Sequence, residues 1–398
     1  MLGKMRLIPA AVTPVRVSDV LISFLKRRGG RREFEKSLAS YLSRGVAVTF
    51  GSLMRTTYAC FVTLKGIRSG TTVILPRYSC PSFAHGILAA GLEIAYCDVR
   101  PETLSINTDK LREMDMQGVL AVVCTNLFGL TSPIDEVINI CRPRGVLVVE
   151  GVDYGLGTEY KNKRIGSLGD VAILNFQEGK AIPVGGGAIA TDIPEFGAKY
   201  GNDRPQAFPN LVTMLGFSLF SRPLLYGVLR KALMLIDLDR IKLSMEDTMR
   251  TTSKETDYAF DPKDSELAVS DFQGRLGLRI LDRLEKDLTQ RASNAKRLKD
   301  GLLECKGTTL VREEAGLTKV HFIRLPVLVG EGRRNAVVNE MLENGIEASP
   351  MYVEHGMQVD RIKFPGAAKV ADELVTLPCH PYTKLDDISR MASILSGC

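Results

Sequence analysis

The sequence predicts an α/β fold, in which a mostly parallel sheet with helices on both faces forms a large domain and a small α/β domain follows it. Strand-like apolar runs alternate with helical patterns between residues 47 and 176, as they do where helices connect parallel strands. The 398 residues, of which 45% are hydrophobic and 25% charged, are enough for both domains. We place the large domain at 1–290 and the small domain at 291–398.

Each predicted element of the large domain has a local signal. An extended N-terminal arm precedes a helix, because Phe34, Leu38, Tyr41 and Leu42 recur at helical spacing. Short apolar runs predict the strands, and the longer patterns between them predict the helices. The predicted strands are 47–50, 72–76, 92–98, 118–124, 146–149 and 171–176, and the predicted helices are 54–65, 82–90 and 134–141. A polar hairpin is expected at 161–163.

Residues 205–245 are predicted to form an apolar helical insertion. Its core, 208–238, is interrupted by Pro209, Arg222, Pro223, Arg230 and Lys231, so we do not expect one helix to cross a bilayer there. A helical pair buried in the core or in a subunit interface is one interpretation. Contact with a membrane surface or with a greasy substrate is the other.

The C-terminal part has a different pattern of predicted helices and strands. A polar loop is predicted at 245–265, and an amphipathic helix is predicted to begin at 270 and to continue through 303. Strands at 320–325 and 348–352 and helices at 333–344 and 386–395 then form the small domain.

Composition excludes several classes of protein. Eight cysteines are scattered without CxxC pairs or metal-ligand spacing, which indicates a reducing cytoplasm and no metal site. The N-terminus lacks the continuous apolar core of a signal peptide. The net charge of +6 is mild, and we expect no nucleic-acid partner. The basic run at 26–32 is either a solvated helix end or a contact for an anionic substrate or membrane.

Lys180 is the candidate catalytic residue. It follows an apolar strand and precedes the run Gly185–Gly187, whose backbone can approach another group closely. Lysine forms covalent bonds with carbonyl compounds such as pyridoxal 5'-phosphate (PLP), and burial makes its free amine available. An ordinary lysine at a strand end is the alternative.

Polar side chains gather where the predicted strands end. Ligands of parallel sheets bind beyond the carboxyl ends of the strands, so these side chains should share one cleft. They are Ser52, Ser79, Cys80, Asn126, Asp153 and Lys180. The turn at Gly51, Ser52 and Leu53 leads into a helix, whose N-terminal amides can bind an anion.

With these residues in view, the chain resembles the DegT/DnrJ/EryC1/StrS family of PLP-dependent sugar aminotransferases, within aminotransferase fold type I. The resemblance covers nearly the whole length. The matching motifs are Gly51-Ser52, CDVRPETLSIN at 97–107, NLFG at 126–129, Glu150 with Gly157 and the run GSLGD at 166–170, Lys180 with its glycine run, SDFQ at 270–273 with Gly277, and LPCHP at 377–381.

The resemblance implies a cofactor, a reaction and a quaternary structure. PLP would be bound covalently by Lys180, which would then act as general base and acid. Gly51, Ser52, the amide of Leu53 and Asn175 would hold the phosphate. The substrates would be a nucleotide-linked keto-sugar or a related keto compound and an amino donor such as glutamate, in cell-surface glycan or secondary metabolism. The enzyme would be a homodimer with its sites at the interface. The cysteine pattern places it in the cytoplasm, and the apolar run 208–238 leaves a membrane-peripheral location open.

Several positions depart from the family pattern. The aspartate that pairs with the pyridinium nitrogen falls on Gly151, and the glutamine near the phenolic oxygen falls on Tyr154. Asp153 would replace the aspartate if the strand stays extended, because side chains alternate with period two. The aromatic that stacks on the ring falls on Cys80, with Tyr78 and Phe83 as nearby candidates to cover it.

The residues that a neighbouring subunit contributes fall on Glu266 and Ala268. A glutamate would repel a phosphate, so either this loop is rebuilt or the phosphate cup is weaker. Two other functions therefore stay open. One is a PLP enzyme with a different reaction or with a lipid-linked or acyl substrate, and the other is a non-catalytic relative that binds a ligand or partner. His85 and His380 are interpreted as structural.

Overall fold

The computed structural model describes residues 6–25, 30–202, 204, 211–235, 267–303, 305–330, 332–352 and 359–397. The predictions for the loop at 245–265, for Glu266 and for the ends of the insertion lie outside these residues.

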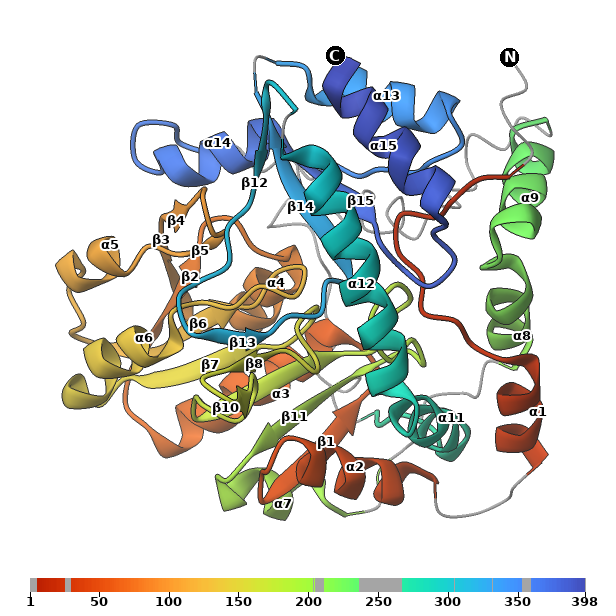
Figure 1. Cartoon of the computed structure of the whole chain (residues 1–398). Helices are drawn as coiled ribbons and strands as arrows, with labels where there is room; N and C mark the ends of the chain where they lie inside the picture. The colour runs from red at the N-terminus through yellow and green to blue at the C-terminus, as the bar shows by residue number, and fades with distance from the viewer. Residues whose placement is uncertain are drawn as a thin grey trace.

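A seven-stranded sheet forms the centre of the molecule (Figure 1), with the order β1-β11-β10-β7-β6-β2-β3. All its pairs are parallel except the two that β11 makes. The strands are β1 (Val46–Phe50), β2 (Thr72–Pro76), β3 (Glu93–Cys97), β6 (Val119–Thr125), β7 (Leu147–Gly151), β10 (Val171–Asn175) and β11 (Gly187–Thr191). Every residue of β6, β10 and β11 is buried, so both faces of the sheet are covered.

Helices cover these faces, and α3 packs against α4, β10 and β11 while α2 packs against α11 and β1. The helices of the N-terminal half are α1 (Val17–Leu25), α2 (Gly30–Tyr41), α3 (Leu53–Ile67), α4 (Pro81–Ala89), α5 (Thr108–Glu113), α6 (Ile134–Cys141), the 3-10 turn η1 (Arg142–Arg144) and α7 (Pro194–Tyr200). The short ribbons are β4 (Val99–Arg100) with β5 (Ser105–Ile106), and β13 (Leu317–Lys319) with the hairpin β8 (Glu159–Tyr160) and β9 (Lys163–Arg164). The predicted hairpin at 161–163 is confirmed.

The C-terminal part forms a second sheet, which lies above the first in Figure 1. Its order is β12-β14-β15, and both pairs are antiparallel. The elements of the C-terminal part are α11 (Asp271–Leu281), α12 (Leu284–Leu302), β12 (Thr308–Leu310), β14 (Arg324–Val329), α13 (Arg334–Glu343), α14 (Pro365–Glu373), β15 (Leu374–Pro378) and α15 (Leu385–Gly397). Because α12 spans residue 290 and joins both parts, the exact domain boundary remains a prediction.

The predicted continuous helix from 270 to 303 is wrong. It breaks between α11 and α12 at Arg283, whose φ of −111° and ψ of 4° are not helical. The Arg283 guanidinium donates to Asp19 and to the carbonyl of Pro14, so bonds to the N-terminal arm accompany the break.

Two predicted strands of the small domain also need correction. Only Ser349 of 348–352 pairs with a strand, because Met351 and Tyr352 have φ of 30° and 63°, in the left-handed region that ends an extended chain. The strand predicted at 320–325 begins later, at Arg324, and β15 was not predicted.

The insertion contains two helices, α8 (Leu211–Phe220) and α9 (Pro223–Leu235). The chain bends by 109° between Leu211–Phe220 and Pro223–Ala232. Pro223 is the first residue of the second helix. Among the described residues no single helix is long and apolar enough to cross a membrane. The bent pair together has the length and apolar composition of a membrane span.

Candidate active site

Lys180 lies in the turn between β10 and β11, with its side chain only 2% exposed. Its Nζ lies 3.1 Å from the centroid of the Tyr154 ring, at cation–π distance. Within the described residues Nζ has no hydrogen-bond partner. The amine is therefore held by an aromatic face and remains open to a reacting group.

The backbone of Lys180 is fixed from the opposite end of the chain. Thr13 Oγ1 donates to the Lys180 carbonyl at 2.6 Å. The buried Arg291 guanidinium in turn donates to Thr13 Oγ1 at 2.8 Å and to the Val12 carbonyl at 2.6 Å. The N-terminal arm and α12 thus position the turn that carries the lysine.

Asp153 is the carboxylate beside this amine. It is 5% exposed, and its Oδ1 has no hydrogen-bond partner among the described residues. Burial raises its pKa from 3.8 to about 6, although the Lys180 ammonium and the Asn175 side chain favour the charged form. The strand ends at Gly151, so Asp153 reaches this place through a turn rather than by the alternation that we assumed.

This shift predicts a pH-dependent effect of Asp153→Asn in the protein without cofactor. Above pH 6 the folded wild type carries a buried carboxylate that the unfolded chain ionises more easily, which costs about 3 kcal/mol. Below pH 3.8 the carboxyl is protonated in both states and the cost disappears. The stabilisation by Asp153→Asn should therefore grow as the pH rises from about 4 to about 6, measured by urea unfolding.

Asp135 provides a control of opposite sign. Burial opposes its ionisation, but bonds to Lys161 and Tyr160 hold its pKa below the ordinary value. Asp135→Asn should therefore remove stability that is present at neutral pH and absent in acid. A gain for Asp153→Asn that stays constant with pH would contradict the buried, unpaired carboxyl.

Phe83 occupies the space where the family aspartate would lie. A Cβ added to Gly151 would be 2.8 Å from Phe83 Cζ, which is closer than van der Waals contact allows. Any side chain at 151 must displace the buried ring. A carboxylate at this place is thus excluded by packing, and Asp153 is the nearby acid.

Gly151→Ala should destabilise the fold by about 1–3 kcal/mol through this clash. The same substitution should cost much less in a Phe83→Leu background, because the shorter side chain leaves room. Thermal unfolding of the four proteins measures the coupling. Gly66→Ala is a matched control, since nothing lies within 4 Å of the added Cβ, and it should stabilise α3 slightly. Equal costs in both backgrounds would contradict the clash.

The predicted anion site lies at the N-terminus of α3. Ser52 is its N-cap, and Ser52 Oγ accepts from the Arg55 amide at 3.2 Å. A Cβ on Gly186 would lie 2.4 Å from the Phe50 carbonyl, so the glycine run brings the Lys180 turn against the end of β1. Gly51, Ser52 and Leu53 therefore border the lysine turn and leave helix amides for an anion.

Other predicted side chains have mixed outcomes. Cys80 is the N-cap residue of α4, and its thiol makes no capping hydrogen bond. Burial raises its pKa, and Asp153 raises it further. Asn175 Oδ1 accepts from the Gln177 amide at 2.9 Å, and its side chain also interacts with Asp153. Cys80, Asp153, Tyr154, Asn175 and Lys180 are thus brought together, whereas Ser79 is buried with no direct link to the lysine in the described contacts.

Two matched motifs serve the fold. Glu150 accepts hydrogen bonds from the amides of Gly166, Leu168 and Gly169 at 2.7–2.8 Å. Glu150 and the glycine-rich turn at 166–170, which both match the family pattern, are therefore held together by these hydrogen bonds. Burial lowers the pKa of His380 to about 3, and His380 Nε2 donates to the Pro9 carbonyl at 2.9 Å, in agreement with a structural role.

Sequence reasoning missed Arg291 and Tyr352. Arg291 lies on the buried stripe of α12 between Leu288 and Ala295, and an arginine at an apolar position was the available signal. Tyr352 is buried, packs edge-on against Tyr78 at 5.5 Å and interacts with Tyr154. Its place in the site was not predicted, because the sequence at 348–352 was interpreted as a strand.

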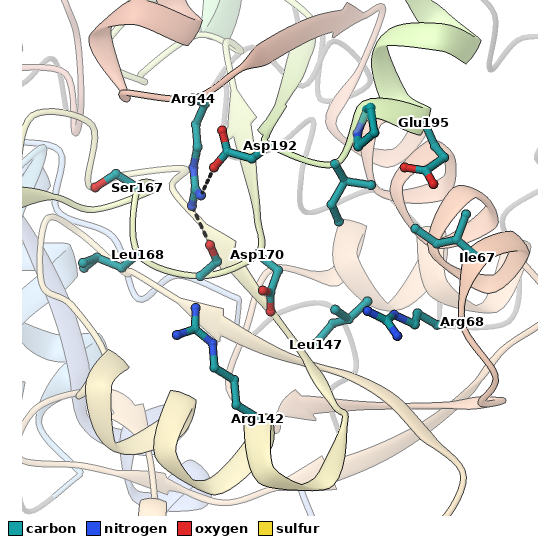
Figure 2. Close-up of a pocket in the computed structure, with 13 residues that line it drawn as sticks. Arg44, Ile67, Arg68, Arg142, Leu147, Ser167, Leu168, Asp170, Asp192 and Glu195 are labelled. Carbon is teal, nitrogen blue, oxygen red and sulfur yellow. Dashed lines mark hydrogen bonds and ion pairs between the residues drawn. The ribbon is translucent and has the colours of Figure 1, made fainter.

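A separate hollow of about 560 Å³ lies at the amino ends of β7 and β10, whereas Lys180 and Asp153 follow the carboxyl ends of these strands. Figure 2 shows that Arg44, Arg68 and Arg142 line it together with Asp170, Asp192 and Glu195. Arg44 is already paired with Asp192 at 3.0 Å. None of the predicted site residues lines this hollow.

The residues around Lys180 fit PLP. A buried amine and a buried carboxyl oxygen, both without hydrogen-bond partners in the described chain, cost folding free energy until another group satisfies them. The aldehyde of PLP suits the amine, and its ring nitrogen suits the acid. The helix N-terminus of α3 suits its phosphate.

Comparison with known proteins identifies the family. The sequence pattern of the DegT/DnrJ/EryC1/StrS aminotransferase family matches residues 15–202 and 243–396. The chain belongs to this family. The comparisons thereby confirm the predicted family, the aminotransferase fold and the prediction of an enzyme.

Individual relatives agree with this assignment. The chain is 24% identical over 377 residues to a GDP-perosamine synthase of Caulobacter vibrioides, a match that covers 91% of this chain and 88% of the relative. The crystal structure of DesI in the presence of its TDP-sugar product superposes with a TM-score of 0.73 at 18% identity, over 99% of this chain and 93% of DesI. The PLP form of Spr1654 from Streptococcus pneumoniae gives a TM-score of 0.71 at 15% identity, over 98% and 97% of the two chains.

Proposed function

We propose that this protein is a PLP-dependent aminotransferase that converts the keto group of a nucleotide-linked sugar into an amine, in glycan or secondary-metabolite biosynthesis. The observation that carries the proposal is the pair of buried groups without hydrogen-bond partners among the described residues, Lys180 Nζ and Asp153 Oδ1. The names of the relatives, which include a GDP-perosamine synthase and a protein with a TDP-sugar product, support a nucleotide-linked substrate.

Each residue of the site has a distinct task in this function. PLP supplies an electron sink for the substrate carbanion when it is bound. Lys180 Nζ would bind it, and as a free amine would move a proton between two carbons that are separated by the amino nitrogen, a 1,3-proton shift. The Tyr154 ring limits where Nζ can lie. Asp153 holds the ring nitrogen, and Ser52, the Leu53 amide and Asn175 hold the phosphate.

The resemblance to the family also suggests the quaternary structure and the amino donor. The active unit is a homodimer with sites at the interface, and the amino donor is an amino acid such as glutamate. The segment at Leu267 supports a rebuilt loop, because its carbonyl accepts from the Gly51 amide of the same chain at 2.8 Å. The protein works in the cytoplasm, which is consistent with seven described cysteines that are all free.

A two-stage experiment tests this function. Purified protein is mixed with PLP and examined for a visible absorption band that Lys180→Ala lacks. L-glutamate is then expected to bleach that band, and a nucleotide-linked keto-sugar is expected to restore it and to yield an amino sugar detected by mass spectrometry. Failure to form the band would sink the proposal.

Altered chemistry is the second candidate, and the packing of Phe83 on Gly151, which leaves no room for a side chain at position 151, favours it. A site whose acid has moved to Asp153 would hold PLP yet act on another substrate, such as a lipid-linked or acyl compound. In that case the visible band forms and Lys180→Ala abolishes it, but nucleotide-linked keto-sugars fail to restore it after bleaching. The second stage of the experiment therefore separates the two candidates.

A further inference from the structure

Tyr352 brings a buried hydroxyl to the active site, and no described residue bonds to it. The residue is 5% exposed, and its OH is one of the buried polar atoms without a hydrogen-bond partner in the described chain. Burial raises its pKa well above 10, and the neighbouring Tyr154, Cys80 and Asp153 raise the pKa further. Tyr154 is therefore close, although it does not meet the geometry of a hydrogen bond. Such a hydroxyl costs folding free energy until another group satisfies it.

The neighbours of Tyr352 are also the neighbours of Lys180. The Lys180 Nζ lies 3.1 Å from the centroid of the Tyr154 ring. The charge of Lys180 also acts on Cys80 and on Asp153. The hydroxyl and the amine therefore belong to one site.

The backbone that carries Tyr352 is held in an uncommon conformation. Met351 and Tyr352 have φ of 30° and 63°, in a region that large side chains rarely adopt. Tyr78 OH donates to the Met351 carbonyl at 2.7 Å, and the amide and hydroxyl of Thr376 both donate to the Ser349 carbonyl. Strained residues of this kind persist where the surrounding structure imposes them, and they concentrate at functional sites.

Tyr352 reaches the site from the C-terminal part of the chain, where Ser349 pairs with β15. The residues that fit PLP follow strands of the central sheet, since Ser52 comes after β1, Asp153 after β7 and Lys180 after β10. They suit the phosphate, the ring nitrogen and the aldehyde of the cofactor. A donor from the other sheet is therefore available for the molecule that reacts with the cofactor.

The chemistry of the hydroxyl selects between the two substrates. With its pKa well above 10, Tyr352 stays neutral and can donate one hydrogen bond. The carboxylates of an amino donor such as glutamate are bound more strongly by cations. A sugar presents neutral keto and hydroxyl oxygens, which a neutral phenol suits.

We propose that the Tyr352 hydroxyl donates a hydrogen bond to an oxygen of the keto-sugar and so contributes to substrate specificity. This inference rests on the proposed function and deepens it, because it assigns a sugar contact to a residue of the C-terminal part.

Tyr352→Phe in the protein without PLP tests whether the hydroxyl lacks a partner. Removal of a buried, unsatisfied OH should raise the midpoint of thermal unfolding by about 1–3 °C. Tyr78→Phe is the control of opposite sign, because it removes the bond to the Met351 carbonyl and should lower the midpoint. A lower midpoint for Tyr352→Phe would show that the hydroxyl is bonded within the protein, and would overturn the inference.

Steady-state kinetics test the sugar contact, with GDP- and dTDP-linked 4-keto-6-deoxyhexoses as probes and L-glutamate as amino donor. Tyr352→Phe should raise the KM for the keto-sugar about tenfold. PLP should still give the visible absorption band, and glutamate should bleach it at the wild-type rate. Tyr160→Phe is the matched control, because its hydroxyl bonds to Asp135 at 2.6 Å in another part of the molecule, and it should leave the KM unchanged.

The failures of this inference and of the proposed function differ. An unchanged KM for Tyr352→Phe would overturn the inference alone, and so would weaker PLP binding at an unchanged KM, which would assign the hydroxyl to the cofactor. A wild type that forms no band with PLP, or whose bleached band neither probe restores, would overturn the proposed substrate and this contact together.

Discussion

Lys180→Ala is expected to lower the rate of amino transfer by about 10³-fold or more, because it removes both the covalent attachment for PLP and the group that moves the proton. Nζ reaches the site from a buried position against Tyr154, and among the described residues nothing else bonds to it. The rate is measured with saturating PLP and amino donor, and the visible absorption band is recorded in parallel.

Lys199→Ala is the matched control for this substitution. Lys199 Nζ also lies over a tyrosine ring, at 5.2 Å from Tyr200, but the residue is exposed on α7. Its replacement should leave the rate and the absorption band unchanged. If Lys180→Ala folds normally and transfers amino groups at the wild-type rate, the proposed chemistry is wrong.

Asp153→Asn is expected to lower turnover by about 10²- to 10³-fold, as does the loss of one preorganised electrostatic group in other enzymes. The carboxylate is needed in its charged form to keep the ring nitrogen protonated. Without cofactor the pKa of Asp153 is raised to about 6, and a protonated ring nitrogen beside the carboxylate should lower it. PLP should therefore bind more weakly as the pH falls through about 6, measured by the visible absorption band, and Asp153→Asn should lack this pH dependence.

Position 151 offers a sharper test of where the acid resides. Gly151→Asp should not rescue Asp153→Asn, because Phe83 fills the place of its side chain. Adding Phe83→Ala to that double variant opens the space, and partial recovery of activity is expected. Asp153→Glu should retain more activity than Asp153→Asn. Full activity of Asp153→Asn at neutral pH would show that Asp153 does not serve the ring nitrogen.

Local pattern predicted much of the fold. The boundaries of β2 and α6 agree with prediction at both ends, because an apolar run between polar turns leaves little choice of strand or helix. The break at Arg283 could not be predicted in this way. It coincides with bonds to Asp19 and Pro14, far away in the sequence.

The site was predicted from the positions of strand ends, and this correctly placed Lys180 and Asp153 beside each other. The packing of Phe83 on Gly151 was not predictable, since spacing along the chain gives no distance between a helix and a neighbouring strand. Thr13 carried no signal either, because its role depends on Arg291 and on the Lys180 carbonyl. Long-range contacts therefore determine the details of the site.

The N-terminal arm also constrains the order in which the protein folds. Its bonds join Thr13 to Lys180, Val12 to Arg291 and Pro9 to His380, over separations of 167, 279 and 371 residues. During synthesis, residues 9–13 must wait for Arg291 and His380, which are made much later, before these bonds can form. The central sheet can form earlier from nearer neighbours, but the lysine turn acquires its final support only after Arg291 on α12 has been made.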